Sequence, residues 1–232
     1  MSDKHKSSLH SIVMLTLAAA LTTLLLSGLF QHTKPRIDDQ RQAAIEATLS
    51  QVIPGIEFDN RLQRDRQAIN APGFFQTDQA LWWYPVRLQG QTQAIILDVI
   101  APDGYNGDIR LLVGINRQLE VTGVRVTQHL ETPGLGDAIE YQKSPWVDQL
   151  IGRRLVPNSN EPEAGSQWDH SEWAVRRQGG DFDAITGATV TSSAMIAVVE
   201  RSLEYAHRQR DRWFLPVTQS ASPGPAMEGS QP

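Results

Sequence analysis

Hydrophobic residues recur with different periods along this chain, and each period predicts a different element. Residues 12–30 contain no charged side chain and are mostly apolar. At the rise of an α-helix this stretch spans roughly 30 Å, which is enough to cross the hydrocarbon core of a bilayer. We therefore expect a transmembrane anchor at 12–30, with a short cytoplasmic segment at 1–11.

A cleaved signal peptide is the alternative interpretation of this stretch. Its apolar region would be unusually long, and Ser27-Gly28-Leu29 is a mediocre small-x-small cleavage site. Lysine or arginine stands at a similar distance on both sides of the stretch, so the charges leave the orientation open.

The segment from Trp82 to Thr127 changes to short β-rich runs separated by glycine, proline and asparagine turns. We expect an antiparallel meander of four strands here. In the third run four apolar residues alternate with the residues between them, which predicts one strongly apolar face for the strand. The four are Ile109, Leu111, Val113 and Ile115.

A helix should cover that face, and residues 192–212 are the best candidate because Met195, Val199, Leu203 and Ala206 recur at helical spacing. Residues 36–50 predict a second helix that serves as a stalk, ended by Pro54-Gly55. We expect a surface loop at 150–169 and a short strand at 173–175. The tail at 216–232 is expected to be disordered. The predicted fold class is α+β: a single N-terminal transmembrane helix followed by one domain, 35–215, with an antiparallel sheet packed by helices.

The amino-acid composition excludes several kinds of partner and cofactor site. The 26 acidic residues outnumber the 21 basic ones and give a net charge of −5, which argues against nucleic acid as a partner. The chain has no cysteine, so disulfides, iron–sulfur ligation and thiolate metal sites are excluded. Its six histidines never fall at ligand spacing, and we expect no metal site.

The stretch DAITGATVTSS at 183–193 brings five hydroxyl residues to the start of the predicted amphipathic helix. Ordinary N-capping explains such a cluster: Thr191 or Ser192 would accept hydrogen bonds from free amides. The same helix N-terminus is also a receptor for phosphate, because its amides are unsatisfied and its dipole is positive there. The residues alone leave both interpretations open.

The string D-x-x-T-G-A-T-x-T at 183–191 resembles the flavinylation motif of the FMN-binding domains of the Rnf/Rsx G subunit and of the C subunit of the sodium-pumping NADH:quinone reductase. Two further stretches carry the resemblance: the hairpin APDGYNGDIRLLVG at 101–114 and the loop HLETPGLGD at 129–137. The loop, together with Trp146 and GGDFD at 179–183, is more similar to the Rnf G subunit.

This resemblance implies an FMN joined by a phosphoester to Thr191, attached by a flavin transferase that uses FAD and magnesium. It implies an electron carrier with no catalytic residue of its own. The loop at 129–137 would lie over the flavin ring and tune its potential. The implied FMN-binding residues are Asp183, Thr186, Gly187, Ala188, Thr189, Glu131, Thr132, Leu135 and Gly136.

The resemblance also implies a place in the bacterial inner membrane, with the C-terminal domain in the periplasm. The expected partners are the membrane-spanning and iron–sulfur subunits of a complex that couples NADH/ferredoxin electron transfer to ion movement, or that keeps a redox-sensing regulator reduced. Three alternatives stand beside it. One is the FMN-binding subunit of the quinone reductase, and another is a non-redox, membrane-anchored binding or assembly module in which TGATVTSS merely caps a helix. The third is a flavinylated regulator or reductase fragment outside the Rnf complex.

Overall fold

The computed structural model of the protein describes residues 14–17, 19–20, 22–24, 45–157 and 168–214. Contacts divide the chain into two units, residues 1–47 and 48–232. The described residues of the second unit form the α+β domain, which is the fold class that the sequence predicts.

In the first unit the described residues between 14 and 24 are helical, as are residues 45–47. Within the described parts of the chain, no helix is both long and apolar enough to cross a membrane. Much of the predicted anchor, the segment at 1–11 and the tail at 216–232 lie outside the described residues. These three expectations therefore stay predictions.

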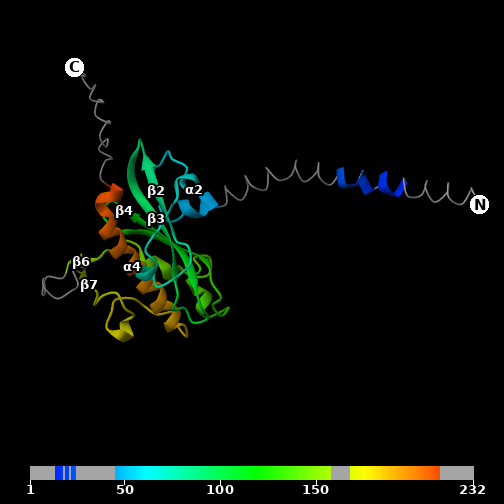
Figure 1. Ribbon diagram of the computed structural model, residues 1–232. Coiled ribbons are helices and arrows are strands. Elements are labelled where there is room, and N and C mark those ends of the chain that lie inside the picture. Colours follow the sequence, from blue (N-terminus) through cyan, green and yellow to red (C-terminus); the bar gives the residue numbers. More distant parts are fainter. Residues whose placement is uncertain (1–13, 18, 21, 25–44, 158–167, 215–232) are drawn as a thin grey trace, which may run out of the picture. The chain divides into compact units, whose positions relative to one another are not determined.

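The sheet of the second unit is an antiparallel meander whose strands lie side by side in chain order (Figure 1). Its strands are β1 (Gln67–Ala68), β2 (Trp82–Leu88), β3 (Gln91–Ala101), β4 (Ile109–Asn116) and β5 (Val121–Gln128). The four predicted strands are confirmed as β2 to β5. Turns separate each strand from the next. The two-residue strand β1 is too short to leave a signal of its own.

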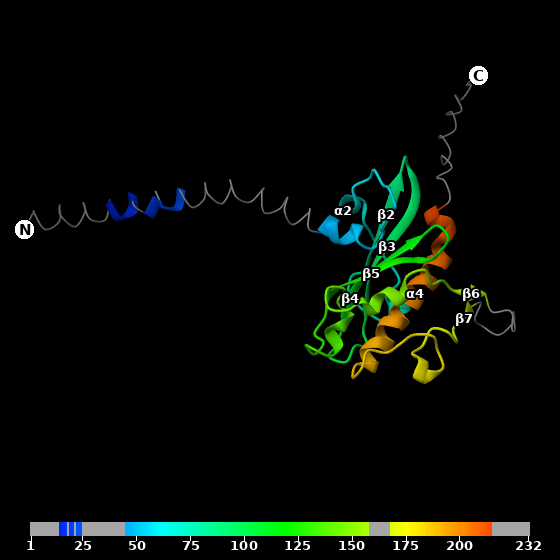
Figure 2. The same cartoon turned by 180° about the vertical axis from the view of Figure 1, so that it is seen from behind.

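One face of the sheet packs against the long helix α4 (Thr189–Phe214), which crosses it in both views (Figures 1 and 2). The four alternating residues of β4 lie on this face, and all of them are fully buried. On the helix, Met195, Val199 and Leu203 are equally buried. The predicted pairing of the apolar strand face with the amphipathic helix is therefore confirmed.

The opposite face of the sheet is covered by residues 49–53, which begin within the helical stretch 45–50. Leu49, Val52 and Ile53 are buried there against Tyr84 and Ile96. Residues 36–44 of the predicted stalk helix lie outside the described residues. Its end packs against the sheet instead of standing free, because Leu49 belongs to this second core. The short helices α2 (Leu62–Asp65) and α3 (Pro72–Phe75) complete the segment before β2.

Between β5 and α4 the described residues form three 3-10 helices and one antiparallel strand pair. The 3-10 helices are η1 (Gly136–Ile139), η2 (Pro145–Leu150) and η3 (Arg176–Gln178), and the strand pair joins β6 (Val156–Pro157) to β7 (Trp168–Asp169). Of the surface loop predicted at 150–169, residues 158–167 lie outside the described residues, and the short strands β6 and β7 flank them. The predicted strand at 173–175 is a single bridge between Val175 and Phe182.

Candidate functional site

Helix α4 begins at Thr189, so Thr191 is the third residue of its first turn. The sequence had placed the start at Ser192, with Thr191 or Ser192 as the cap. That start is wrong, since the amide of Ser192 already bonds the Ala188 carbonyl at 3.0 Å. Three amides, those of residues 189–191, come before the first intrahelical bond, and they give this end of the helix its positive potential.

Ser192 holds the preceding loop onto the helix. Its hydroxyl accepts the amide of Ile185 at 2.9 Å and donates to the Ala188 carbonyl at 3.0 Å. Gly187 lies in this loop with φ +80, a left-handed conformation that glycine adopts without strain. The TG turn is thus fixed directly in front of the first helical turn.

Thr191 is fully buried, and its hydroxyl donates a 2.8 Å hydrogen bond to Oε2 of Glu131. Glu131 comes from the loop after β5, 60 residues away in sequence, and is only 5% exposed. A buried hydrogen bond to a carboxylate contributes about 1.5–3 kcal/mol. This contact joins the two stretches that the sequence singled out separately.

Three other groups hold Glu131. The amide of Asn106, in the β3–β4 turn, donates to Oε1 at 3.3 Å. The amide of Glu131 itself donates to Nδ1 of His129 at 3.0 Å. Gly136 passes so close that an added Cβ would lie 2.6 Å from Oε2 of Glu131 and 3.2 Å from the Thr191 hydroxyl. Glu131 is therefore anchored on one side and covered by the Gly136 backbone on the other.

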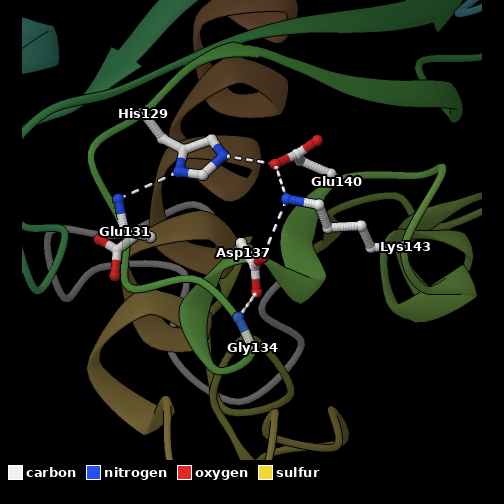
Figure 3. A network of polar contacts seen from close by, with 6 residues as sticks. All are labelled: His129, Glu131, Gly134, Asp137, Glu140 and Lys143. Carbon is white, nitrogen blue, oxygen red and sulfur yellow. Dashed lines mark hydrogen bonds and ion pairs between the residues drawn. The ribbon is translucent and has the colours of Figure 1, made fainter.

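A polar network connects residues of this loop with η1 and with Lys143 (Figure 3). Because Nδ1 of His129 accepts a hydrogen bond, its ring proton lies on Nε2, which contacts Glu140 at 3.0 Å. Lys143 bridges Glu140 at 2.6 Å and Asp137 at 2.8 Å, and Asp137 accepts the Gly134 amide at 2.8 Å. The network fixes both ends of the segment 131–137.

The other predicted site residues lie around this contact. Leu135 reaches across to Gly187, where an added Cβ would lie 3.1 Å from the leucine side chain. Thr132 accepts the side-chain amide of Asn106 at 3.1 Å. Thr186 and Gly187 are exposed, Thr189 is half-buried and Ala188 is buried.

Asp183 is oriented differently from the rest of the predicted set. Its carboxylate is exposed and pairs with Arg176 at 3.3 Å. Its backbone carbonyl accepts the Trp146 indole at 2.6 Å, and its amide donates to Gln149 at 2.9 Å. Asp183 therefore positions the loop through its backbone, while its side chain faces Arg176 and not Thr191.

Comparison with known proteins places this chain in a family. Residues 104–204 match the model of an FMN-binding domain, and residues 1–52 match that of the RnfG N-terminal region. The G subunit of the ion-translocating oxidoreductase complex from Shewanella oneidensis is 40% identical over 193 residues, 83% of this chain and 86% of the relative. This chain belongs to the G-subunit family.

Two other relatives of the same name agree. The G subunit from Pseudomonas aeruginosa is 38% identical over 211 residues, 91% of this chain and 94% of the relative. That from Aliivibrio fischeri is 36% identical over 208 residues, 89% of this chain and 94% of the relative. Of the two families that the motif at 183–191 resembles, the Rnf G subunit is confirmed.

Sequence reasoning missed several residues of this site. The sequence places Gly104 and Asn106 only in a hairpin. An added Cβ at Gly104 would overlap the Gly107 carbonyl oxygen and lie 2.9 Å from Oε1 of Glu131. Lys143 belongs to no motif, and the sequence indicates Ser192 only as a possible helix cap. The PDGYNGD stretch signals a turn through its Pro, Asp, Gly and Asn residues, but it does not show what the turn contacts.

The arrangement suits an FMN phosphate in part. The free amides of the first turn, the Gly187 turn and the Thr191 hydroxyl are the groups that a phosphoester needs. The buried position of Thr191 and the carboxylate beside it oppose a second negative charge at the same place. The amides and the Gly187 turn therefore fit an FMN phosphate, while Glu131 and Gly136 occupy the space directly beside the Thr191 hydroxyl.

The network in Figure 3 makes a pH-dependent prediction. The Lys143 ammonium holds the pKa of Asp137 and of Glu140 below their ordinary values of 3.8 and 4.5. A carboxylate whose pKa is lowered in the folded state stabilises the fold at a pH above its ordinary pKa, and this stabilisation is lost as the pH falls through the lowered pKa. Lys143→Met should therefore have a lower melting temperature than wild type at pH 7. The difference between the two melting temperatures should become smaller below about pH 4.

Thermal unfolding followed by circular dichroism between pH 7 and pH 3 checks this prediction. Arg177→Met, which removes an exposed cation elsewhere on the surface, is the matched control. A gap for Lys143→Met that stays constant across this range would contradict the role of the network.

Proposed function

We propose that this chain is the FMN-bearing electron-transfer subunit of a membrane-bound, ion-translocating oxidoreductase complex, with FMN joined by a phosphoester to Thr191. The single observation that carries the proposal is the contact of Thr191 with Glu131 at the start of α4, inside the matched FMN-binding domain. FMN when bound supplies reversible electron uptake and release, and the protein supplies position and electrostatics.

Within this proposal, each part of the site has a task. The amides of residues 189–191 and the positive end of α4 favour the phosphate. The exposed Thr186 and Gly187 leave room for the ribityl chain, and Leu135 offers an apolar surface to the ring. Glu131, Thr132 and Gly136 line the opposite wall, while Asp183 and Ala188 set the backbone of the turn.

The proposal extends to the cellular setting through the family. Residues 12–30 would anchor the chain in the bacterial inner membrane, and the domain would lie in the periplasm, where a covalent link prevents loss of the cofactor. The relatives are named as parts of an ion-translocating oxidoreductase complex. Membrane-spanning and iron–sulfur subunits would exchange electrons with the FMN, in a chain between NADH and ferredoxin or in one that keeps a redox-sensing regulator reduced. A flavin transferase would attach the FMN.

The test is co-expression of the full chain with an active flavin transferase, or with an inactive one. Flavin fluorescence is then measured on denaturing gels, together with the intact mass. We expect a fluorescent band and the mass of one added FMN only with the active transferase. A dark band beside a labelled positive-control substrate would favour the non-redox module.

A further inference from the structure

The environment of the Thr191 hydroxyl differs from that of every other hydroxyl in the motif. Thr191 donates its proton to a carboxylate, Oε2 of Glu131, at 2.8 Å. Ser192 donates to a backbone carbonyl, which cannot take up a proton, and the buried hydroxyl of Ser193 has no hydrogen-bond partner among the described residues. Among the described residues of the motif, Thr191 alone is hydrogen-bonded to a group that can act as a base.

A threonine hydroxyl is a weak nucleophile until an adjacent base removes its proton. From this geometry we propose that Glu131 is the general base of its own chain's flavinylation, accepting the Thr191 proton as the hydroxyl oxygen attacks. The inference rests on the proposed attachment of FMN to Thr191. It assigns to the acceptor protein a catalytic residue for that attachment.

The step balances with FAD as the co-reactant. Oγ1 of Thr191 forms a bond to the phosphorus on the riboflavin side of the pyrophosphate. The bond from that phosphorus to the bridging oxygen breaks, and AMP leaves with its electron pair. The proton of Thr191 passes to Glu131. The neutral carboxyl that results no longer opposes the negative phosphoester formed beside it.

The contacts that hold Glu131 would keep this base in place while residues 133–136, which cover Thr191, move. Its amide is held by His129 at 3.0 Å and its Oε1 by the Asn106 amide at 3.3 Å, and neither contact involves residues 133–136. Gly136 covers the Thr191 hydroxyl, as shown by the 3.2 Å separation that an added Cβ would have. Since Thr191 is fully buried, FAD reaches it only when this segment withdraws.

A purely structural role for Glu131 makes different predictions. If the carboxylate only locked the loop closed, its removal would expose Thr191 and speed the labelling. If it only filled space, its amide would serve equally well. A base predicts slow labelling with the amide, because glutamine accepts a hydrogen bond but takes up no proton at neutral pH.

The experiment measures the initial rate of FMN incorporation into the full purified chain by a flavin transferase with FAD and Mg²⁺. Wild type, Glu131→Gln and the exposed control Glu172→Gln are compared at equal concentrations. We expect Glu131→Gln to be slower by about 100-fold or more, since general bases contribute about 10²–10⁴-fold. Glu172→Gln should match wild type. Labelling of Glu131→Gln at or above the wild-type rate overturns the proposal.

Chemical rescue separates lost base chemistry from lost structure. Glu131→Ala leaves space beside Thr191, and sodium formate should restore part of its labelling rate, while sodium chloride at the same ionic strength should not. A folded Glu131→Ala chain that is slow and insensitive to formate overturns the proposal. Failure of the attachment itself would look different: wild type would stay unlabelled, or the label would lie on a residue other than Thr191.

Discussion

Thr191→Ala is expected to abolish covalent flavin completely. The change removes the only motif hydroxyl that is hydrogen-bonded to a carboxylate among the described residues. The neighbouring Ser192 does not replace it, because its hydroxyl is committed to the Ile185 amide and the Ala188 carbonyl. Fluorescence on denaturing gels and intact mass after co-expression with a flavin transferase measure the loss.

Two variants control this result. Thr191→Ser retains a hydroxyl at the same place in the first turn of α4 and should still be labelled. Thr127→Ala removes an exposed threonine of β5 and should be labelled as wild type. Thr191→Ala should also lower the free energy of unfolding by about 1–3 kcal/mol, because Oε2 of buried Glu131 loses its donor. Flavin retained by Thr191→Ala would contradict the assignment of the acceptor.

Gly114→Ala is expected to be the most destabilising small substitution in the sheet. An added Cβ at Gly114 would overlap the Val52 carbonyl oxygen and lie 2.5 Å from Oγ1 of Thr122. Val52 is fully buried and its carbonyl accepts the Thr122 hydroxyl at 2.5 Å, so neither group can move away freely. We expect a loss of about 3 kcal/mol, the upper end of the usual range for overpacking.

Thermal unfolding gives the measurement, with an expected fall in the midpoint of about 6–12 °C for a domain of this size. Gly73→Ala is the matched control, because nothing lies within 4 Å of its added Cβ and its φ is not positive. It should leave the midpoint almost unchanged. A Gly114→Ala midpoint equal to that of Gly73→Ala would contradict the close packing of residues 49–53 on the sheet.

The strands and the long helix could be predicted because their signals are local. Alternation in β4 and helical spacing in α4 both follow from burying one face of each element. The start of α4 was misplaced because the helix begins at Thr189, before any residue of the apolar stripe. Two serines and a threonine there offered several equally good caps.

The second face of the sheet could not be predicted from its strands alone. The sequence shows Gly114 as one residue in an alternating strand, and only the paired Gly123 and the crossing Val52 explain why glycine is needed. Residues 49–53 looked like the end of a stalk because their partners, Tyr84 and Ile96, lie far away in the chain. Such contacts depend on tertiary packing, which periodicity does not encode.

The sequence indicates both stretches that form the site, but it does not show that they contact each other. The motif at 183–191 and the loop at 129–137 were each singled out, and the structure brings them together through Thr191 and Glu131. The outward orientation of Asp183 and the contribution of Asn106 came only from the structure. Both depend on loop conformations, which are set by backbone hydrogen bonds between segments distant in sequence.

The central claim, FMN on Thr191, is tested most directly by locating the modification. The full chain labelled by a flavin transferase is digested, and the flavin-containing peptide is sequenced by tandem mass spectrometry. We predict one added FMN on Thr191, with Thr186, Thr189, Ser192 and Ser193 unmodified. FMN on any of those four residues, or a peptide 183–193 recovered only without FMN from fluorescent protein, would contradict the account.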